Sequence, residues 1–150
     1  MDLQIKGKKA IMAGGSAGMG RATAERLSEA VVDMVITARR KERLEKAAEA
    51  IAAKYKVSVK PIVADSSKAE DRARLLEACP DPDILAITIK PPAPNGDFLK
   101  VTPDMWRESI DTALIGPIEL MRQYIPHMKN MGWGRTVSYT HLRAHETCGH

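Results

Sequence analysis

The sequence predicts an α/β fold in which a mostly parallel sheet is covered by helices on both faces. Short apolar runs alternate with longer segments whose apolar residues recur at helical spacing, up to about residue 135. No repeat or low-complexity tract interrupts this alternation. Strands that alternate with helices form βαβ units with right-handed crossovers, so neighbouring strands are expected to run parallel.

Strands are expected wherever a short, largely apolar run is bounded by charged or turn-forming residues. The first run ends at Gly14-Gly15, which favours a strand entering a tight turn. The expected strands are 9–13, 34–38, 57–64 and 83–89, and a fifth is expected to begin at Arg135.

Helices are expected in the amphipathic segments between these runs. The first follows the glycines and would bury Met19, Ala22, Leu27 and Ala30. The second spans 41–54, and the third is expected to begin at the Ser66-Ser67 pair.

A longer helix is expected from Thr102-Pro103 to about residue 130, where Gly132 and Gly134 would end it. Pro117 lies inside this helix and has no N–H to offer the carbonyl of Ala113, so we expect a kink there. The apolar side of this helix consists of Trp106, Ile110, Ala113, Leu114, Pro117, Met121, Ile125 and Met128.

The composition is that of a soluble chain of one-domain size: 150 residues, 44% hydrophobic and 28% charged. Neither a membrane span nor a signal peptide is recognisable, so we expect a cytoplasmic protein without a membrane partner. The net charge of +4 is spread among acids, and aromatic residues are few, so nucleic acid is not an expected partner. Cys79 and Cys148 fit neither a disulfide framework nor a zinc site; no metal is expected, and Cys79 is expected to be half-buried.

The segment 13–20 is the strongest functional motif. Its glycines lie between a strand and a helix, where backbone N–H groups can hold a phosphate beside the positive end of the helix. Their spacing differs from G-x-G-x-x-G, but the placement is the one that dinucleotide binding requires. The alternative is a loop whose glycines serve packing alone. The candidate cofactor-binding residues of this loop are Gly14, Ser16, Gly18, Met19 and Gly20.

The loop resembles the T-G-x-x-x-G-x-G motif of the short-chain dehydrogenase/reductase (SDR) family, with Ala13 in place of Thr. Further similarity, to 3-oxoacyl-acyl-carrier-protein reductases in particular, lies in Gly96-Asp97-Phe98, Trp106, Pro126-His127-Met128 and Gly132-Trp133-Gly134-Arg135. The resemblance covers residues 5–135. It implies a Rossmann-like doubly wound parallel sheet, present here as its N-terminal part with strands 1–4 and the start of strand 5. It also implies hydride transfer between a nicotinamide cofactor and a small ketone or secondary alcohol, by a parent protein that is a homo-oligomer.

The residues after the second strand favour NADP, with NADPH as the reduced form. An NAD enzyme would carry an acid there, whereas Arg39 and Arg40 offer guanidinium groups that bind a phosphate bidentately. The alternative is that Arg39 and Arg40 are only the polar start of the second helix. Because no acid stands at this position, we prefer the cofactor role for Arg39, and less so for Arg40. The resemblance also implies cofactor contacts by Asp65, at the adenine-binding position, and by Ser66 and Thr88.

Several residues depart from the family pattern. The family's Asn-Asn-Ala-Gly corresponds to Ile87–Lys90, and Ala113 stands at the Asn of the catalytic tetrad. The family uses a Ser, a Tyr and a Lys four residues after the Tyr, but no Tyr-x-x-x-Lys occurs here; Tyr139 with Arg143 is the nearest imitation. No catalytic residue is therefore assigned. The alternative function is that of a non-catalytic nucleotide-binding protein with the same fold.

The last fifteen residues differ from the rest. They contain three of the four histidines, and the apolar periodicity stops near Thr136. Residues 137–147 resemble one translated reading frame of a transposon sequencing adapter. We therefore expect an incomplete NADP-binding domain over 1–135 and a non-native tail over 136–150. A His-rich metal-binding tail is the alternative interpretation.

Overall fold

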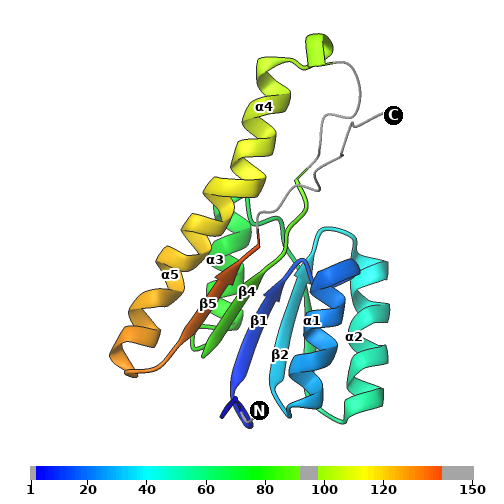
Figure 1. Ribbon diagram of the computed structural model, residues 1–150, viewed down its shortest axis with the longest axis vertical. Coiled ribbons are helices and arrows are strands. Elements are labelled where there is room, and N and C mark those ends of the chain that lie inside the picture. Colours follow the sequence, from blue (N-terminus) through cyan, green and yellow to red (C-terminus); the bar gives the residue numbers. More distant parts are fainter. Residues whose placement is uncertain (1–2, 92–97, 140–150) are drawn as a thin grey trace, which may run out of the picture.

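The computed structural model describes residues 3–91 and 98–139 and contains a five-stranded sheet in the order β3-β2-β1-β4-β5 (Figure 1). All four neighbouring pairs are parallel. The winding reverses between β1 and β4, as a doubly wound Rossmann-like sheet requires, so the predicted fold class is confirmed. The strands are β1 (Lys9–Ala13), β2 (Asp33–Ala38), β3 (Val59–Val63), β4 (Ile84–Ile87) and β5 (Arg135–Ser138).

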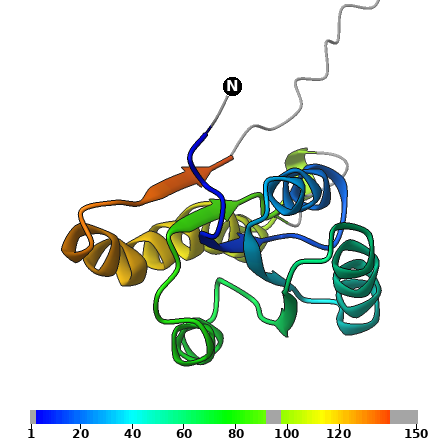
Figure 2. The same cartoon turned by 90° about the horizontal axis from the view of Figure 1, so that it is seen from below.

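Helices cover both faces of the sheet. Seen from below, α1 and α2 lie on one side of it and α3 and α5 on the other (Figure 2). None of the helices in the described ranges is long and apolar enough to cross a membrane. The helices are α1 (Gly18–Glu29), α2 (Lys41–Tyr55), α3 (Ala69–Ala78), α4 (Pro103–Ile110) and α5 (Gly116–Asn130), with a 3-10 turn at Phe98–Lys100 and a π-helical turn at Asp111–Ile115.

The core consists of two apolar layers, one on each face of the sheet. Alternate residues of β1 point to opposite faces, with Ala10 and Met12 in one layer and Ile11 and Ala13 in the other. The first layer packs against α1 and α2, and the second packs against α3 and α5. Burial on both faces explains why these strands are continuous apolar runs.

Two details of the helices α1 and α3 correct the sequence prediction. Met19 and Ala22 are exposed, whereas Leu27 and Ala30 are partly buried against the core. The fully buried residues of α1 are Gly20, Ala24 and Ser28, and at Gly20 a Cβ would collide with the Gly14 carbonyl. The helix α3 begins at Ala69 rather than at the serine pair. Those serines lie in a turn, because the Asp65 carboxylate accepts a hydrogen bond from the Ser67 N–H and so favours a turn over a helix.

The long helix also differs from the prediction. A π-helical turn directly precedes Pro117, and in it the Gly116 N–H donates to the Asp111 carbonyl. This wider turn accommodates a proline that cannot donate a helical hydrogen bond. The side that faces the sheet consists of Thr112, Gly116, Pro117, Leu120, Tyr124 and Met128. Much of the predicted apolar side is exposed instead, namely Trp106, Ile110, Leu114 and Ile125.

Smaller differences concern segment ends and one thiol. The third and fourth strands are each three residues shorter than predicted, and Cys79 is buried rather than half-buried. Burial raises the pKa of the Cys79 thiol. The strand β5 begins at Arg135 as predicted and continues to Ser138, into the segment expected to be non-native. The late histidines and Cys148 lie outside the described residues.

The largest buried side chain of the second core layer is Tyr124, on α5. It is fully buried, and among the described residues its hydroxyl has no hydrogen-bond partner. Burial therefore raises its pKa well above the ordinary value of about 10. A buried hydroxyl without a partner costs free energy relative to a hydrogen in the same place.

We predict that Tyr124→Phe leaves the free energy of unfolding unchanged or raises it by about 1 kcal/mol, because the lost hydroxyl forms no bond. Tyr124→Ala should lower it by about 3–5 kcal/mol through the cavity it creates. Urea unfolding measures both. Because folding raises the Tyr124 pKa, unmodified protein should lose stability as the pH rises above about 10, and the Phe variant should lose less. A Phe variant that is destabilised by several kcal/mol at neutral pH would contradict this account.

Candidate functional site

The candidate site lies at the carboxyl edge of the sheet, where β1 and β4 are neighbours. In a parallel sheet all strands end at the same edge, and ligands bind where the strand order reverses. The register aligns Ala13 of β1 with Thr37 of β2 and with Ile87 of β4. The segments that follow these strands therefore meet at one place, and they carry most of the predicted cofactor-binding residues.

Gly14 makes the turn out of β1. Its φ of +89° is a conformation that glycine adopts without strain, and its N–H donates to the Thr37 carbonyl at 2.9 Å. A Cβ at this position would lie 2.9 Å from the Thr88 carbonyl oxygen. Thr88 is held there because its own N–H donates to the Ala13 carbonyl at 2.9 Å. The turn is therefore possible only without a side chain at residue 14.

Gly20 brings α1 against the same place. It is buried, and a Cβ would collide with the Gly14 carbonyl and lie 2.5 Å from Thr88 Oγ1. The first turn of α1 thus touches the ends of β1 and β4. Its N–H groups remain available to a ligand, since the N-cap residue Ala17 provides no side-chain cap.

The outer surface of the loop is open to a ligand. Gly18 is exposed, and nothing lies within 4 Å of the place where its Cβ would be. Met19 is 52% exposed. Ser16 is half-buried at the mouth of the loop. Exposed backbone amides at the start of a helix favour a phosphate, so the geometry suits the pyrophosphate of a dinucleotide.

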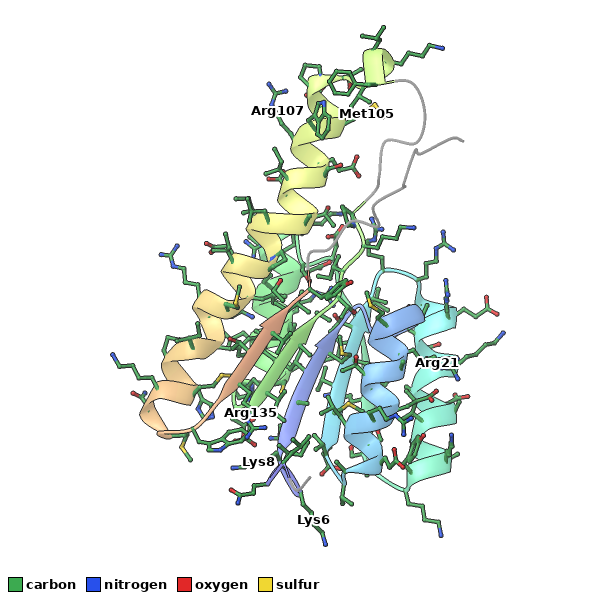
Figure 3. All side chains as sticks on the ribbon, in the orientation of Figure 1. Lys6, Lys8, Arg21, Met105, Arg107 and Arg135 are labelled. Carbon is green, nitrogen blue, oxygen red and sulfur yellow. The ribbon has the colours of Figure 1, made fainter. Side chains whose placement is uncertain are left out.

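A hollow of about 620 Å³ adjoins the loop. Arg21 reaches it from α1 on the side that faces α2 (Figure 3), and Arg40 reaches it from the start of α2. Arg39, which the sequence favoured over Arg40, is exposed and does not line it. The hollow is lined by Ser16, Ala17, Gly18, Arg21, Arg40, Glu42, Arg43 and Lys46.

Sequence reasoning missed three of these cations, Arg21, Arg43 and Lys46. They come from two helices that pack side by side, so no single motif joins them. The only signal in the sequence is the spacing of residues 40, 43 and 46, which places them on neighbouring turns of one helix.

Asp65 and Ser66 follow β3 at the same edge and are fixed by hydrogen bonds. Asp65 Oδ1 accepts from the N–H and the hydroxyl of Ser67, at 3.0 and 2.7 Å. The N–H of Asp65 donates to Asp71 of α3 at 2.8 Å. The Arg74 guanidinium and that N–H hold the pKa of the Asp71 carboxyl below its usual range, so it remains an acceptor at neutral pH.

The buried Ser66 also sets how closely α5 approaches. Its carbonyl accepts from Arg72 at 2.8 Å and lies 2.8 Å from where a Cβ of Gly116 would be. Ala113 lies in the π-helical turn just before Gly116, half-buried and with only a methyl group at the position of the family's Asn. Tyr139 directly follows β5, where its N–H donates to the Ile87 carbonyl at 2.8 Å, and Arg143 lies outside the described residues.

The glycine contact can be tested by substitution. In an ordinary helix, Gly→Ala stabilises by about 1 kcal/mol. Gly20→Ala should instead lower the free energy of unfolding by about 1–3 kcal/mol, because the methyl group meets the Gly14 carbonyl. Chemical denaturation measures this. At Gly18, where a Cβ finds open space, only the cost of the left-handed backbone, about 1 kcal/mol, is expected. A stabilised Gly20→Ala variant would show that the contact does not constrain the fold.

Comparison with known proteins agrees with the geometry. Residues 8–147 match the family model described as short chain dehydrogenase. The chain is 28% identical to the 3-oxoacyl-[acyl-carrier-protein] reductase FabG of Aquifex aeolicus, over 92% of this chain and 57% of that protein. It is 33% identical to an uncharacterized oxidoreductase of Listeria monocytogenes, over 83% of this chain and 51% of that protein.

Among solved structures, the L-sorbose reductase of Gluconobacter frateurii, complexed with NADPH and L-sorbose, superposes with a TM-score of 0.81 at 26% identity. The match covers 88% of this chain and 51% of that one. The chain thus spans about half the length of the relatives it matches. The fold, the glycine loop and these matches together place the chain in the short-chain dehydrogenase family, whose members bind a nicotinamide cofactor.

Proposed function

We propose that this chain binds NADP and is the cofactor-binding part of a reductase that transfers hydride from NADPH to a ketone. The observation that carries the proposal is the cationic hollow beside the glycine loop. Four of its eight lining residues are Arg or Lys, and only Glu42 is acidic. A surface of that charge favours a ligand with a phosphate on the adenosine half, which distinguishes NADP from NAD.

Each part of the site has a separate task in this proposal. The amides of the glycine loop hold the pyrophosphate, and the arginines beside it bind the 2′-phosphate. Asp65 and Ser66 contact the adenine side, whereas Thr88 keeps the loop in contact with β4. The bound cofactor supplies the hydride. Arg39, exposed after β2, remains a candidate for an outer contact to the same phosphate.

A non-catalytic nucleotide-binding protein is the second candidate. Ala113 has no side-chain amide at the position where the family has its Asn, and Tyr55, Tyr124 and Tyr139 are followed four positions later by Val59, Met128 and Arg143. Both candidates bind NADP in the same way. They differ in turnover by the longer protein to which residues 1–135 would belong.

We also propose that residues 136–150 are not native to this protein. The proposal rests on the likeness of 137–147 to an adapter sequence and on the end of the apolar periodicity near Thr136. The nucleotide sequence of the source genome across codon 135 tests it. A genomic reading frame that encodes Thr136–His150 as given would refute it.

The exposed apolar side chains of α4 and α5 support a homo-oligomeric parent. Trp106, Ile110, Leu114, Ile118 and Ile125 are each more than 40% exposed. They lie on α4, on α5 and on the π-helical turn between them, and α4 extends beyond the strand ends (Figure 1). Apolar patches of this kind mark association surfaces. We propose a cytoplasmic location for this protein, with a small carbonyl compound as its substrate.

The first prediction concerns cofactor preference. The 150-residue chain should bind NADPH at least about tenfold more tightly than NADH, because a hydrogen bond to a charged group contributes about 1.5–3 kcal/mol. Isothermal titration calorimetry with both cofactors measures the ratio. The Arg39→Ala variant shows whether the outer arginine contributes to it. Equal affinities for NADPH and NADH would contradict the NADP assignment.

The second prediction concerns turnover. The 150-residue chain should reduce ketones at least 10²-fold more slowly than the longer natural protein, since a positioned proton donor contributes about 10²–10⁴-fold. NADPH oxidation at 340 nm with a panel of ketones and acyl thioesters measures both. Similar rates would direct attention back to Tyr139 and Arg143. If the longer protein binds NADPH but reduces no substrate of the panel, that result favours the non-catalytic nucleotide-binding function.

A further inference from the structure

The hollow beside the glycine loop contains more cations than the residues after β2 provide. Arg21 and Lys46 enter it from α1 and from the second turn of α2, in addition to Arg40 and Arg43. The arginine that the sequence favoured, Arg39, is not among its lining residues. To find the residues that would contact a phosphate here, we ask which cations of the hollow are not already paired with an acid of the protein.

Two of the four cations are already neutralised within the protein. Lys46 Nζ lies 2.7 Å from Glu42 Oε1, and Arg21 Nε lies 3.2 Å from Glu25 Oε1. A paired cation attracts an anion less, because the neighbouring carboxylate cancels most of its field. Arg21 and Lys46 therefore line the hollow but contribute little net positive charge to it.

Arg40 and Arg43 make no ion pair and no side-chain hydrogen bond with any residue in the described part of the chain. They stand three positions apart at the start of α2, a spacing that brings two side chains together on one side of a helix. Both line the same hollow as the loop residues Ser16 and Gly18. Two guanidinium groups match a phosphate monoester, which carries close to two negative charges and accepts bidentate hydrogen bonds.

We propose that Arg43 together with Arg40 forms the 2′-phosphate clamp of this chain, and that Arg43 determines the preference for NADP. The inference rests on the proposed function and adds a residue of α2 that lies outside the strand-end motif. Glu42 opposes the clamp, because its carboxylate adds negative charge to the hollow and pairs with Lys46.

The test uses ligands that carry only the adenosine half of the cofactor, since the residues at stake bind that half. Calorimetry on the 150-residue chain compares 2′,5′-ADP with 5′-AMP, which lacks the 2′-phosphate. Arg43→Gln should lower the affinity for 2′,5′-ADP by about tenfold and leave that for 5′-AMP unchanged. Glu42→Gln should raise the affinity for 2′,5′-ADP, because it frees Lys46. The control is Arg26→Gln, which removes a positive charge from α1 away from the hollow and should change neither affinity.

The outcomes separate this inference from the proposed function. If the unmodified chain prefers 2′,5′-ADP and Arg43→Gln keeps that preference, the clamp is wrong and the NADP assignment stands. If the unmodified chain binds neither ligand, both the clamp and the proposed NADP-binding function are wrong. Circular dichroism checks that each variant is folded. Should Arg43→Gln not fold, Arg43→Lys replaces it. The Lys variant keeps the charge but loses the bidentate geometry, so it should lose part of the preference, and an unchanged preference would again overturn the clamp.

Discussion

The contact between Gly14, Gly20 and Thr88 governs the arrangement of the whole site. Neither glycine has room for a side chain, because the Gly14 carbonyl and the end of β4 occupy that space. This contact places the first turn of α1 at the point where the sheet reverses its winding. As a result, the amides of the loop, the start of α2 and the end of β4 surround one edge of the sheet. A bulkier residue at 20 would move α1 away from β1 and would separate these groups.

The same constraint explains which parts of the fold were predictable. Strand β1 and helix α2 were predicted to within one residue, because both are fully determined by local apolar patterns. The buried side of α1 was not, since close packing selects Gly20, Ala24 and Ser28 and leaves Met19 exposed. On α5 the sheet-facing side combines Gly116 and Pro117 with Leu120 and Tyr124, whereas Ile118 and Ile125 form a second apolar side. Periodicity finds apolar sides of a helix, but it does not tell which one faces the sheet.

The candidate site also has one part that could be predicted from the sequence and one part that could not. The glycine loop could be found from sequence because its glycines and its place between a strand and a helix lie within eight consecutive residues. The cationic hollow could not, because Arg21 and Arg43 meet only after α1 and α2 have packed side by side. The turn at Asp65 likewise depends on Asp71 and Arg74, which reach back from α3. Residues that act through tertiary contacts leave no motif, even when they lie within a few positions of one that does.

The central claim is that a dinucleotide binds at the carboxyl edge of the sheet, between the glycine loop and α2. Backbone hydrogen exchange of the 150-residue chain, measured with and without saturating NADPH, tests it most directly. We expect slower exchange in residues 14–21 and 39–46, with little change at the amino edge around Gly7 and Lys8. Unchanged exchange in the glycine loop, or protection confined to the amino edge, would contradict the account.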